Sequence, residues 1–409
     1  MDSVSEAPPS FMKIFSTSLL VFGNVLGVGV LALPITAGLG GFIPALIGIV
    51  GIWFVMLFAA WIIASRIDPK KKNFDLPSFY HQELGATGKW IAIACNLIIL
   101  YGVLVAYLSG ISSMMTSLFS SLATHSTAIT LIYFCITTAL IIFGLKALKS
   151  GMIFLVAATW SCFILMIATG FTYFNPHNLT FMSWEYVPIV LPIAVSASHF
   201  HNIIPTVSKS LNHDQPATRK AILLGVFMGL VINMIWVLVV LGTLPQNGAG
   251  AHSIVYANWH GLTANVPMSE ILHSKVFLYS GLCFGLLAVT SSFMTNGAGL
   301  FGFIQDLTTT YLKTESKLLV GALSFLPPLI VTLLYPRLFL AALSVVGGVG
   351  EDILFAILPA IVLIKLTRSK QRHFQLVGYA MLIIGLFICP FVIGQKLGFI
   401  HLLPPAVIS

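Results

Sequence analysis

Long apolar stretches occupy most of this chain and set the strongest limit on what it can fold into. Of its 409 residues, 58% are hydrophobic and only 8% are charged, whereas soluble domains carry about 25% charged residues. A run of about 20 apolar residues is long enough to cross the hydrocarbon core of a membrane as an α-helix. Runs of this kind lie near 14–37, 42–65, 89–118, 128–146, 151–173, 185–208, 219–243, 271–304, 318–335, 338–366 and 375–396. The sequence therefore predicts an all-α membrane protein with eleven transmembrane helices.

The basic residues lie mostly on one side of these predicted spans. Of the 20 Lys and Arg residues, all but Lys275, Arg337 and Lys396 fall at span ends or in loops that an alternating path puts on one side. Cytoplasmic loops are enriched in Lys and Arg, so this bias places the N-terminus in the cytoplasm and the C-terminus outside. A soluble helical bundle would not produce such a distribution. The net charge of +8 thus reflects topology in a cytoplasmic membrane and does not indicate a nucleic-acid partner.

Two spans carry helix-breaking or polar residues at matching places. The first reads GNVLGVGVLALP from Gly23 to Pro34, and the sixth reads SASHFHNIIP from Ser196 to Pro205. Gly and Pro weaken helices, and unwound backbone at membrane depth is tolerated only where it lines a cavity or is buried in protein. Interruptions five spans apart are typical of transporters built from inverted repeats, with the substrate site near the midplane. Close helix packing is the alternative explanation for the glycines of the first span.

Such breaks suit an amino-acid substrate. Half-helix N-termini offer free N–H groups and a positive dipole end to a carboxylate, while unwound carbonyls and hydroxyls can hold the ammonium group. Glycine lets the backbone itself approach the ligand, so a bulky substitution at Gly29 is expected to abolish uptake and leave folding intact. Tyr107 of the third span could close over the substrate or simply pack against other helices.

Five short motifs carry a resemblance to a known family. They are GVGVLALP (27–34), AYLSG (106–110), FHNIIP (200–205), SSFMTNGAGLFGFIQD (291–306) and FLPPLIVTLLYPR (325–337). Their order and span positions resemble those of the aromatic amino acid permeases, tyrosine- and tryptophan-specific transporters of the hydroxy/aromatic amino acid permease family. That family lies within the amino acid–polyamine–organocation superfamily, and the resemblance covers essentially the whole chain.

The resemblance implies a LeuT-like core of two inverted five-helix repeats plus one extra helix, and uptake driven by protons. It divides the chain into a cytoplasmic tail (1–13), a first repeat (14–173), a second repeat (185–366), an eleventh helix (375–396) and an external tail (397–409). The substrate-binding residues that we predict are Asn24, Gly27, Val28, Gly29, Tyr107, Ser198, His199, His201, Asn202 and Asn296.

The first span is also similar to that of sodium-coupled members of this fold. This likeness implies that the substrate carboxylate meets the N–H groups of Val28 and Gly29. It also implies a possible sodium site formed by Gly23, Leu26, Ala288, Ser291 and Ser292. A second sodium site would need a polar residue where this chain has Val30.

Two departures leave the side-chain pocket and the coupling ion open. His199 and Asn202 stand where the resemblance would place small residues, so the pocket could differ in size. The fifth span lacks the lysine that replaces sodium in several proton-coupled relatives. Proton coupling is the expectation, and sodium coupling by the same fold is the alternative.

Adjacent acids in the tenth span are the candidate proton carriers. Glu351 and Asp352 follow the flexible GGVG stretch (347–350) and lie midway along the span. Acids at such depth are costly and usually face a cavity or a partner, and two neighbouring carboxylates are not both ionised cheaply. A packing role held by hydrogen bonds is the alternative, and His199 with His201 are alternative proton carriers. These two histidines lack a third ligand nearby, so no metal site is expected.

The most direct interpretation is a secondary transporter that imports an amino acid, with aromatic preference, by alternating access. Its expected partners are the substrate and membrane lipid, with no cofactor and no obligate protein partner. A transporter of another small zwitterion or amine is the next possibility. A membrane enzyme would need a catalytic group such as HExxH, and a channel would need rings of charge or carbonyls; neither pattern is present in the sequence.

Overall fold

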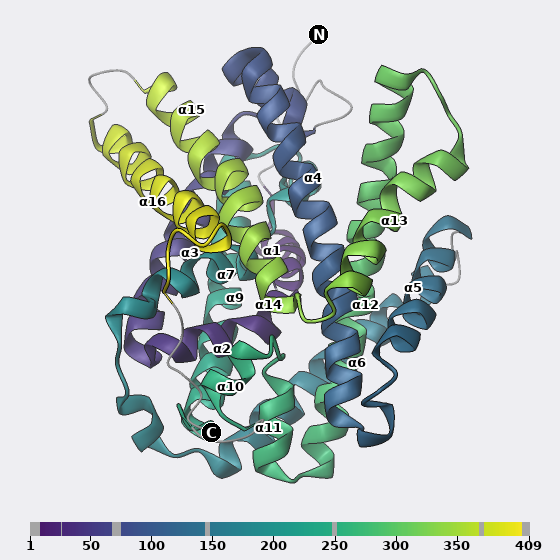
Figure 1. Ribbon diagram of the computed structural model, residues 1–409. Coiled ribbons are helices and arrows are strands. Elements are labelled where there is room, and N and C mark those ends of the chain that lie inside the picture. Colours follow the sequence, from purple (N-terminus) through teal and green to yellow (C-terminus); the bar gives the residue numbers. More distant parts are fainter. Residues whose placement is uncertain are drawn as a thin grey trace.

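The computed structural model describes residues 9–25, 27–67, 75–143, 148–247, 252–367 and 372–402, and over these ranges the chain forms helices joined by loops. Figure 1 shows most of the long helices running roughly along one direction, with the short helices α10 and α11 gathered at one end. The segments long and apolar enough to cross a membrane are Phe42–Ser65, Leu76–Leu118, Trp184–Ser210, Gln215–Thr243, Lys275–Leu312, Lys317–Leu334 and Arg372–Lys396. The bent pair Phe11–Val25 and Gly29–Gly40 passes the same test when it is taken together. The chain is thus an all-helical membrane protein.

The first half of the chain contains one broken helix and one kinked helix. α1 and α2 meet at an angle of 62°. α4 bends at Gly85, which has a φ of 76°. Glycine adopts this backbone conformation readily because it has no Cβ. The elements of this half are α1 (Phe11–Val25), α2 (Gly29–Gly40), α3 (Phe42–Ser65), α4 (Leu76–Leu118), η1 (Ser120–Leu122), α5 (Ser126–Phe143), α6 (Leu148–Gly170), η2 (Phe171–Tyr173), η3 (Pro176–Thr180) and η4 (Trp184–Tyr186).

The second half contains another broken helix and a stretch of π-helix. α7 ends at Ala197, and after a short non-helical stretch the chain resumes as η5 and α8. The elements are α7 (Val187–Ala197), η5 (His201–Ile203), α8 (Ile204–Ser210), α9 (Gln215–Thr243), α10 (Ile254–Trp259), α11 (Asn265–Leu272), α12 (Lys275–Leu307), η6 (Thr308–Leu312), α13 (Lys317–Leu334), α14 (Phe339–Val345), η7 (Val346–Glu351), η8 (Ile353–Ile357), α15 (Leu358–Leu366) and α16 (Arg372–Lys396). The elements η6, η7 and η8 are π-helical. Both interruptions predicted from the sequence, in the first and sixth spans, are confirmed.

Local sequence explains several helix starts. Asp75 accepts a hydrogen bond from the backbone N–H of Ser78 at 2.7 Å, and Asp214 does the same for Ala217 at 2.7 Å. A side-chain oxygen at this position satisfies one of the unpaired donors of the first turn. A proline also occupies the first turn of α4, α8 and α9, where the missing N–H costs no helical hydrogen bond.

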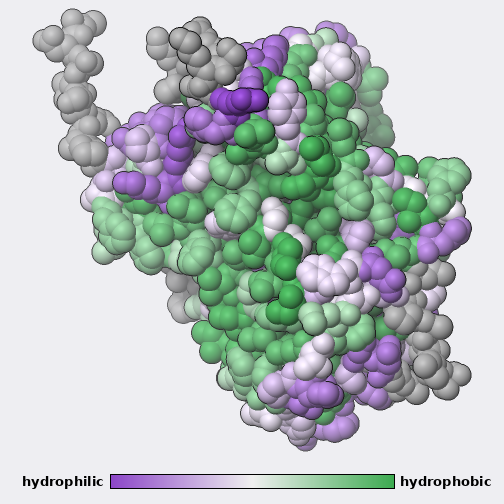
Figure 2. All heavy atoms as spheres, turned by 90° about the vertical axis from the view of Figure 1, so that its left-hand side faces the viewer, coloured by the Kyte–Doolittle hydropathy of each residue, from purple (hydrophilic) through white to green (hydrophobic). Residues whose placement is uncertain are grey.

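The surface matches a membrane setting. Figure 2 shows hydrophobic side chains across the middle of one face and hydrophilic ones gathered mainly toward its two ends. Many large apolar side chains are exposed, among them Phe54 (49%), Ile132 (61%) and Ile383 (68%). A soluble monomer rarely exposes a continuous apolar surface of this kind.

Small residues allow α1 and α9 to approach closely. A Cβ added at Gly225 would lie 2.5 Å from the Ser18 carbonyl oxygen, and one added at Gly229 would lie 2.6 Å from the Val25 side chain. Two small residues four positions apart are the usual device for close helix contact within membranes. The α1–α9 pair thereby holds the first half of the broken span in place.

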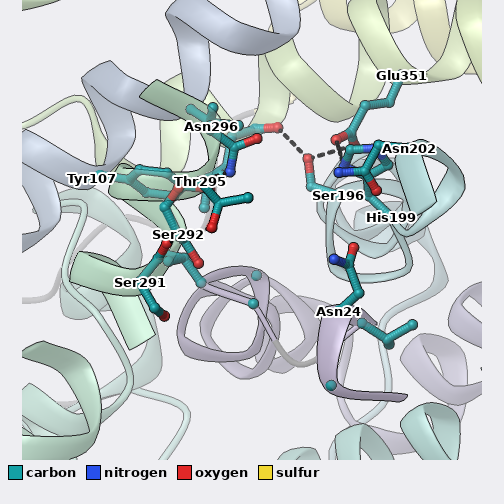
Figure 3. Close-up of a pocket in the computed structure, with 17 residues that line it drawn as sticks. Asn24, Tyr107, Ser196, His199, Asn202, Ser291, Ser292, Thr295, Asn296 and Glu351 are labelled. Atoms are coloured by element: carbon teal, nitrogen blue, oxygen red, sulfur yellow. Dashed lines mark hydrogen bonds and ion pairs between the residues drawn. The ribbon is translucent and has the colours of Figure 1, made fainter. Parts of the chain in front are cut away.

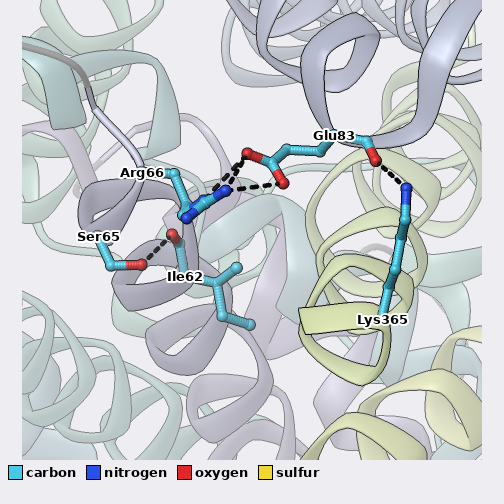
Figure 4. Close-up of polar contacts among 5 residues, drawn as sticks. All are labelled: Ile62, Ser65, Arg66, Glu83 and Lys365. Carbon is cyan, nitrogen blue, oxygen red and sulfur yellow. Dashed lines mark hydrogen bonds and ion pairs between the residues drawn. The ribbon is translucent and has the colours of Figure 1, made fainter. Parts of the chain in front are cut away.

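A buried acid joins three helices at one end of the molecule (Figure 4). Glu83 of α4 accepts from Arg66 Nε at 3.0 Å and from its Nη2 at 3.3 Å, and the backbone carbonyl of Glu83 accepts from Lys365 Nζ at 2.8 Å. The Glu83 side chain is only 6% exposed. A guanidinium that donates two hydrogen bonds to one carboxylate fixes the relative orientation of its partners, so α3, α4 and α15 are tied together here.

Candidate functional site

A polar cavity of about 180 Å³ lies where the two broken helices meet α4, α12 and α14. Figure 3 shows its polar side chains pointing toward one another from opposite walls. The lining residues are Gly23, Asn24, Val25, Gly27, Val28, Gly29, Val103, Tyr107, Ser196, His199, Asn202, Ser291, Ser292, Thr295, Asn296, Leu343 and Glu351.

Backbone forms the wall contributed by the first broken span. Helix α2 begins at Gly29, with Val28 as its N-cap and with backbone hydrogen bonds from Val30 N–H to the Gly27 carbonyl (3.2 Å) and from Leu31 N–H to the Val28 carbonyl (3.0 Å). The first N–H groups of a helix lack intrahelical partners and stabilise a negative charge. This start of α2 lines the cavity, so the wall is suited to a carboxylate.

The opposite wall holds a buried carboxyl group. Glu351 is 1% exposed and ends the π-helix η7. Its Oε1 lies 3.1 Å from His199 Nδ1, and its Oε2 accepts from Ser196 Oγ at 2.9 Å. His199 Nε2 has no hydrogen-bond partner among the described residues. A carboxyl group and an imidazole ring therefore lie side by side at the break in the sixth span, and both line the cavity.

A stripe of polar side chains on α12 forms the third wall. Ser291 and Thr295 lie four residues apart, as do Ser292 and Asn296, so each pair shares one helix face. Asn296 Nδ2 donates to the Tyr107 hydroxyl at 3.2 Å and to the Ser292 carbonyl at 3.0 Å. Tyr107 is 6% exposed and lines the cavity. The predicted aromatic side chain of the third span therefore borders the cavity, and α12 holds its hydroxyl group.

The cavity is open on one side of the breaks and closed on the other. Gly23, Ser291 and Thr295 are exposed and line the cavity, whereas every residue of α2 is buried. On the α2 side, the Ala264 N–H donates to the Leu31 carbonyl at 2.9 Å. The segments around α10 and α11 thus cover α2, and solvent reaches the cavity from the side of α1.

Most of the predicted substrate-binding residues come together here, and two do not. Asn24, Gly27, Val28, Gly29, Tyr107, His199, Asn202 and Asn296 all line the cavity. Ser198 is buried just after α7 and does not line it. His201 also points elsewhere, because its Nε2 lies 3.0 Å from the Met56 carbonyl and its ring stacks on Phe355 with centroids 4.3 Å apart. Its position is explained by packing between α3 and η8.

The two predicted acids separate. Asp352 follows Glu351 but does not line the cavity; a Cβ added at Gly385 of α16 would lie 3.4 Å from both of its carboxyl oxygens. Neither oxygen has a hydrogen-bond partner among the described residues. Successive residues on a helix point in different directions, so one acid of the predicted pair lines the cavity and the other lies against α16.

The predicted sodium ligands lie around two neighbouring cavities. Gly23 and Ser291 line both the central cavity and a smaller one of about 120 Å³, whereas Ser292 lines only the central cavity and Ala288 only the smaller one. The rings of Trp160, Phe163 and Phe284 form much of that smaller cavity. Ser291 Oγ already donates to the Ala288 carbonyl at 3.1 Å. Leu26 lies outside the described residues. Elsewhere in the described ranges, no three His, Cys, Asp or Glu residues gather in a way that could hold a metal ion.

Several lining residues were not predicted from the sequence, notably Ser196, Thr295, Val103 and Leu343. Two of them had a signal. Thr295 stands four residues after Ser291 and shares its helix face, and Ser196 belongs to the polar run that marks the break in the sixth span. Val103 and Leu343 are apolar residues in apolar helices, and nothing in the sequence distinguishes them from core positions.

We expect Asn202 and His201 to respond differently to alanine substitution. Asn202→Ala removes an amide that lines the cavity and should change the order of preference among amino acids, by about tenfold for the most affected substrate. His201→Ala removes a ring packed against Phe355 and should lower thermal stability with the order unchanged. Competition uptake in proteoliposomes and melting curves of the two purified variants are the measurements. The reverse pattern would contradict the placement of these side chains.

Together these features define an integral membrane protein with a ligand-sized polar cavity between two broken helices. The sequence matches the tryptophan/tyrosine permease family over residues 11–395, and the chain belongs to this family. It is therefore a transporter and not an enzyme.

Individual relatives agree with this assignment. Tyrosine-specific transport system 1 of Haemophilus influenzae is 27% identical over 371 residues, covering 89% of this chain and 90% of the relative. A tryptophan-specific transport protein from the same organism is 27% identical over 404 residues, covering 92% of each chain. The crystal structure of MhsT in complex with L-phenylalanine is similar in fold, with a TM-score of 0.54, 12% identity, and coverage of 95% of this chain and 99% of that one.

Proposed function

We propose that this protein imports an amino acid with an aromatic side chain across the cytoplasmic membrane, by symport with a proton and by alternating access. The observation that carries this proposal is the cavity itself, in which the start of α2 faces a wall that contains Glu351. A zwitterion can bind its carboxylate at α2 while Glu351 takes or releases a proton. The names of the tyrosine- and tryptophan-specific relatives, and the L-phenylalanine in the MhsT complex, support this substrate class.

We propose a topology of eleven spans, with ten of them in two inverted five-helix repeats. The broken pairs α1–α2 and α7–α8 are the first helices of the two repeats, and α16 is the additional span. Two shorter apolar helices (Ser126–Ile142 and Ala157–Tyr173) and the segment from α14 to α15 would complete the count. The span ends and loops that are rich in Lys and Arg then lie in the cytoplasm. The open side of the cavity therefore faces inward, and the short helices α10 and α11 lie outside.

Sodium coupling is the alternative, since Gly23, Ala288 and Ser291 do come together around the smaller cavity. Two observations favour the proton. Much of that cavity is aromatic ring, and among the described residues no carboxylate lines it. Val30, where a second sodium ligand would stand, is buried with its carbonyl accepting from Trp236 Nε1 at 3.0 Å.

Uptake by the purified protein in liposomes tests the proposal. With an acidic exterior and no sodium, we expect accumulation of labelled tyrosine, tryptophan or phenylalanine, and little accumulation of alanine or glutamate. A sodium gradient at equal pH on both sides should drive none. Accumulation that follows sodium alone would replace the proton by sodium, and a complete lack of amino-acid uptake would reject the function.

A further inference from the structure

A second cavity, of about 450 Å³, lies on the proposed external side between α4, α10, α11 and the loop before α14. Its lining includes one acid, Glu270, one base, Arg337, and two rings, Tyr256 and His260. Basic residues are sparse on this side of the membrane, where the others are Lys275 and Lys396. The central site does not explain why an acid and a base face one cavity here.

The backbone on both sides of Arg337 is held firmly. Ser109 Oγ donates to the Pro336 carbonyl at 2.6 Å and accepts from the Leu338 N–H at 3.0 Å. A Cβ added at Gly261 would lie 3.1 Å from the Arg337 carbonyl oxygen. Neither the Arg337 guanidinium nor the Glu270 carboxylate has a hydrogen-bond or ion-pair partner among the described residues, and both residues are exposed. Two unpaired opposite charges are therefore available at one fixed place.

Tyr256 and His260 add an aromatic surface to the two charged groups of this cavity. The rings of Tyr256 and His260 are stacked with centroids 3.9 Å apart, and His260 Nδ1 lies 2.9 Å from the Tyr256 carbonyl oxygen. A guanidinium binds a carboxylate through paired hydrogen bonds, a carboxylate binds an ammonium group, and aromatic rings pack against other rings. These three groups match the three parts of an aromatic amino acid.

The second cavity lies further along α4 than the central one. Tyr107 lines the central cavity and Ser113 lines the second, and six residues of α4 span about 9 Å. Between these positions, Phe339 of α14 is fully buried, and a Cβ added at Gly110 would lie 2.9 Å from its ring. This packed contact separates the two cavities.

We propose that the second cavity is an external binding site for the zwitterion of an aromatic amino acid, with Arg337 holding the carboxylate and Glu270 the ammonium group. The proposal rests on the proposed function, because it assigns the cavity the same substrate class. The ligand binds here while the Phe339–Gly110 contact is closed, and it moves to the central cavity when α14 separates from α4.

Substrate protection of an added cysteine tests this site directly. A cysteine at Ala123, which lines the second cavity, is labelled from outside with a membrane-impermeant maleimide, and the chain without the added cysteine is the blank. We expect phenylalanine or tyrosine to slow labelling severalfold. Phenethylamine, which lacks the carboxylate, and phenylpropionate, which lacks the ammonium group, should give little protection.

Three variants separate the two sites. Arg337→Gln should remove the protection and raise the KM for uptake about tenfold or more, since a charged hydrogen-bond partner is lost. Lys275→Gln removes an exposed positive charge at the same end without touching the cavity, and it should change neither property. Gly27→Val, which blocks the central cavity, should keep the protection.

Labelling that saturating substrate does not slow, in vesicles that still transport it, would overturn the external site and leave the proposed function standing. Protection that disappears in Gly27→Val would also overturn it, because the signal would then come from the central cavity. Absence of amino-acid uptake in the unmodified chain would instead reject the proposed function.

Discussion

Replacing Glu351 by glutamine is expected to abolish proton-driven accumulation completely while exchange of substrate across the membrane continues. Glutamine keeps the shape of the side chain and can still bond to Ser196 and His199, but it cannot take up and release a proton. Glu351 is the acid that lines the central cavity, and its side chain is almost fully buried beside His199. Titratable groups placed this way in membrane proteins usually carry protons or ions.

Asp352→Asn is the matched control, because it makes the same chemical change at the next residue. Asp352 lies against Gly385 of α16 and away from the cavity, so this variant should still accumulate substrate under a pH gradient. The measurements are accumulation with an imposed pH gradient and counterflow without one, in proteoliposomes of each variant. Accumulation by Glu351→Gln that follows a sodium gradient would remove the proton assignment and make Ser291 and Ser292 the candidate ion site. Loss of accumulation in both variants would show that the two acids act together.

The sequence was sufficient to predict where the helices break and which stretches meet. Gly27 and Gly29 in one span, and the polar run from Ser196 to Asn202 in the other, are local features, and unwound backbone in a membrane has few acceptable positions. The acids after the GGVG stretch were also visible, because charge inside an apolar span is rare. These features fixed the central cavity in outline.

The direction of individual side chains could not be predicted. His199 and His201 are two residues apart in a non-helical stretch, so no regular period says which one faces the cavity. Glu351 and Asp352 lie where π-helix replaces α-helix, and its i→i+5 hydrogen bonds change the register of every following residue. The pairing of Ser196 with Glu351 joins residues 155 positions apart, and only the packing of α7 against η7 brings them together.

Gly29 lines the central cavity, but its surroundings differ from what the sequence suggests. The sequence alone predicts that a bulky residue at Gly29 blocks the ligand and leaves folding intact. In the structure, a Cβ at Gly29 would lie 2.7 Å from the Ala197 Cα and 3.0 Å from its backbone nitrogen. That expectation is wrong about folding, because Gly29 is where α2 and α7 touch, and neither backbone can move aside easily. Gly27 differs, because a Cβ there would lie 3.9 Å from the Asn24 carbonyl oxygen, an ordinary van der Waals contact.

Valine at Gly27 and valine at Gly29 should therefore fail in different ways. Gly27→Val places its methyl groups in the lined cavity and should reduce substrate binding by at least about tenfold, with thermal stability close to that of the unmodified protein. Gly29→Val forces α2 away from α7 and should destabilise the fold by about 1–3 kcal/mol or more, the usual range for overpacking. Melting curves of the purified variants, read beside equilibrium binding of a labelled aromatic amino acid in an Arg337→Gln background that lacks the proposed external site, distinguish the two. Equal loss of stability in both variants would place Gly27 in the packing between helices, and full binding by Gly27→Val would mean that this backbone does not contact the substrate.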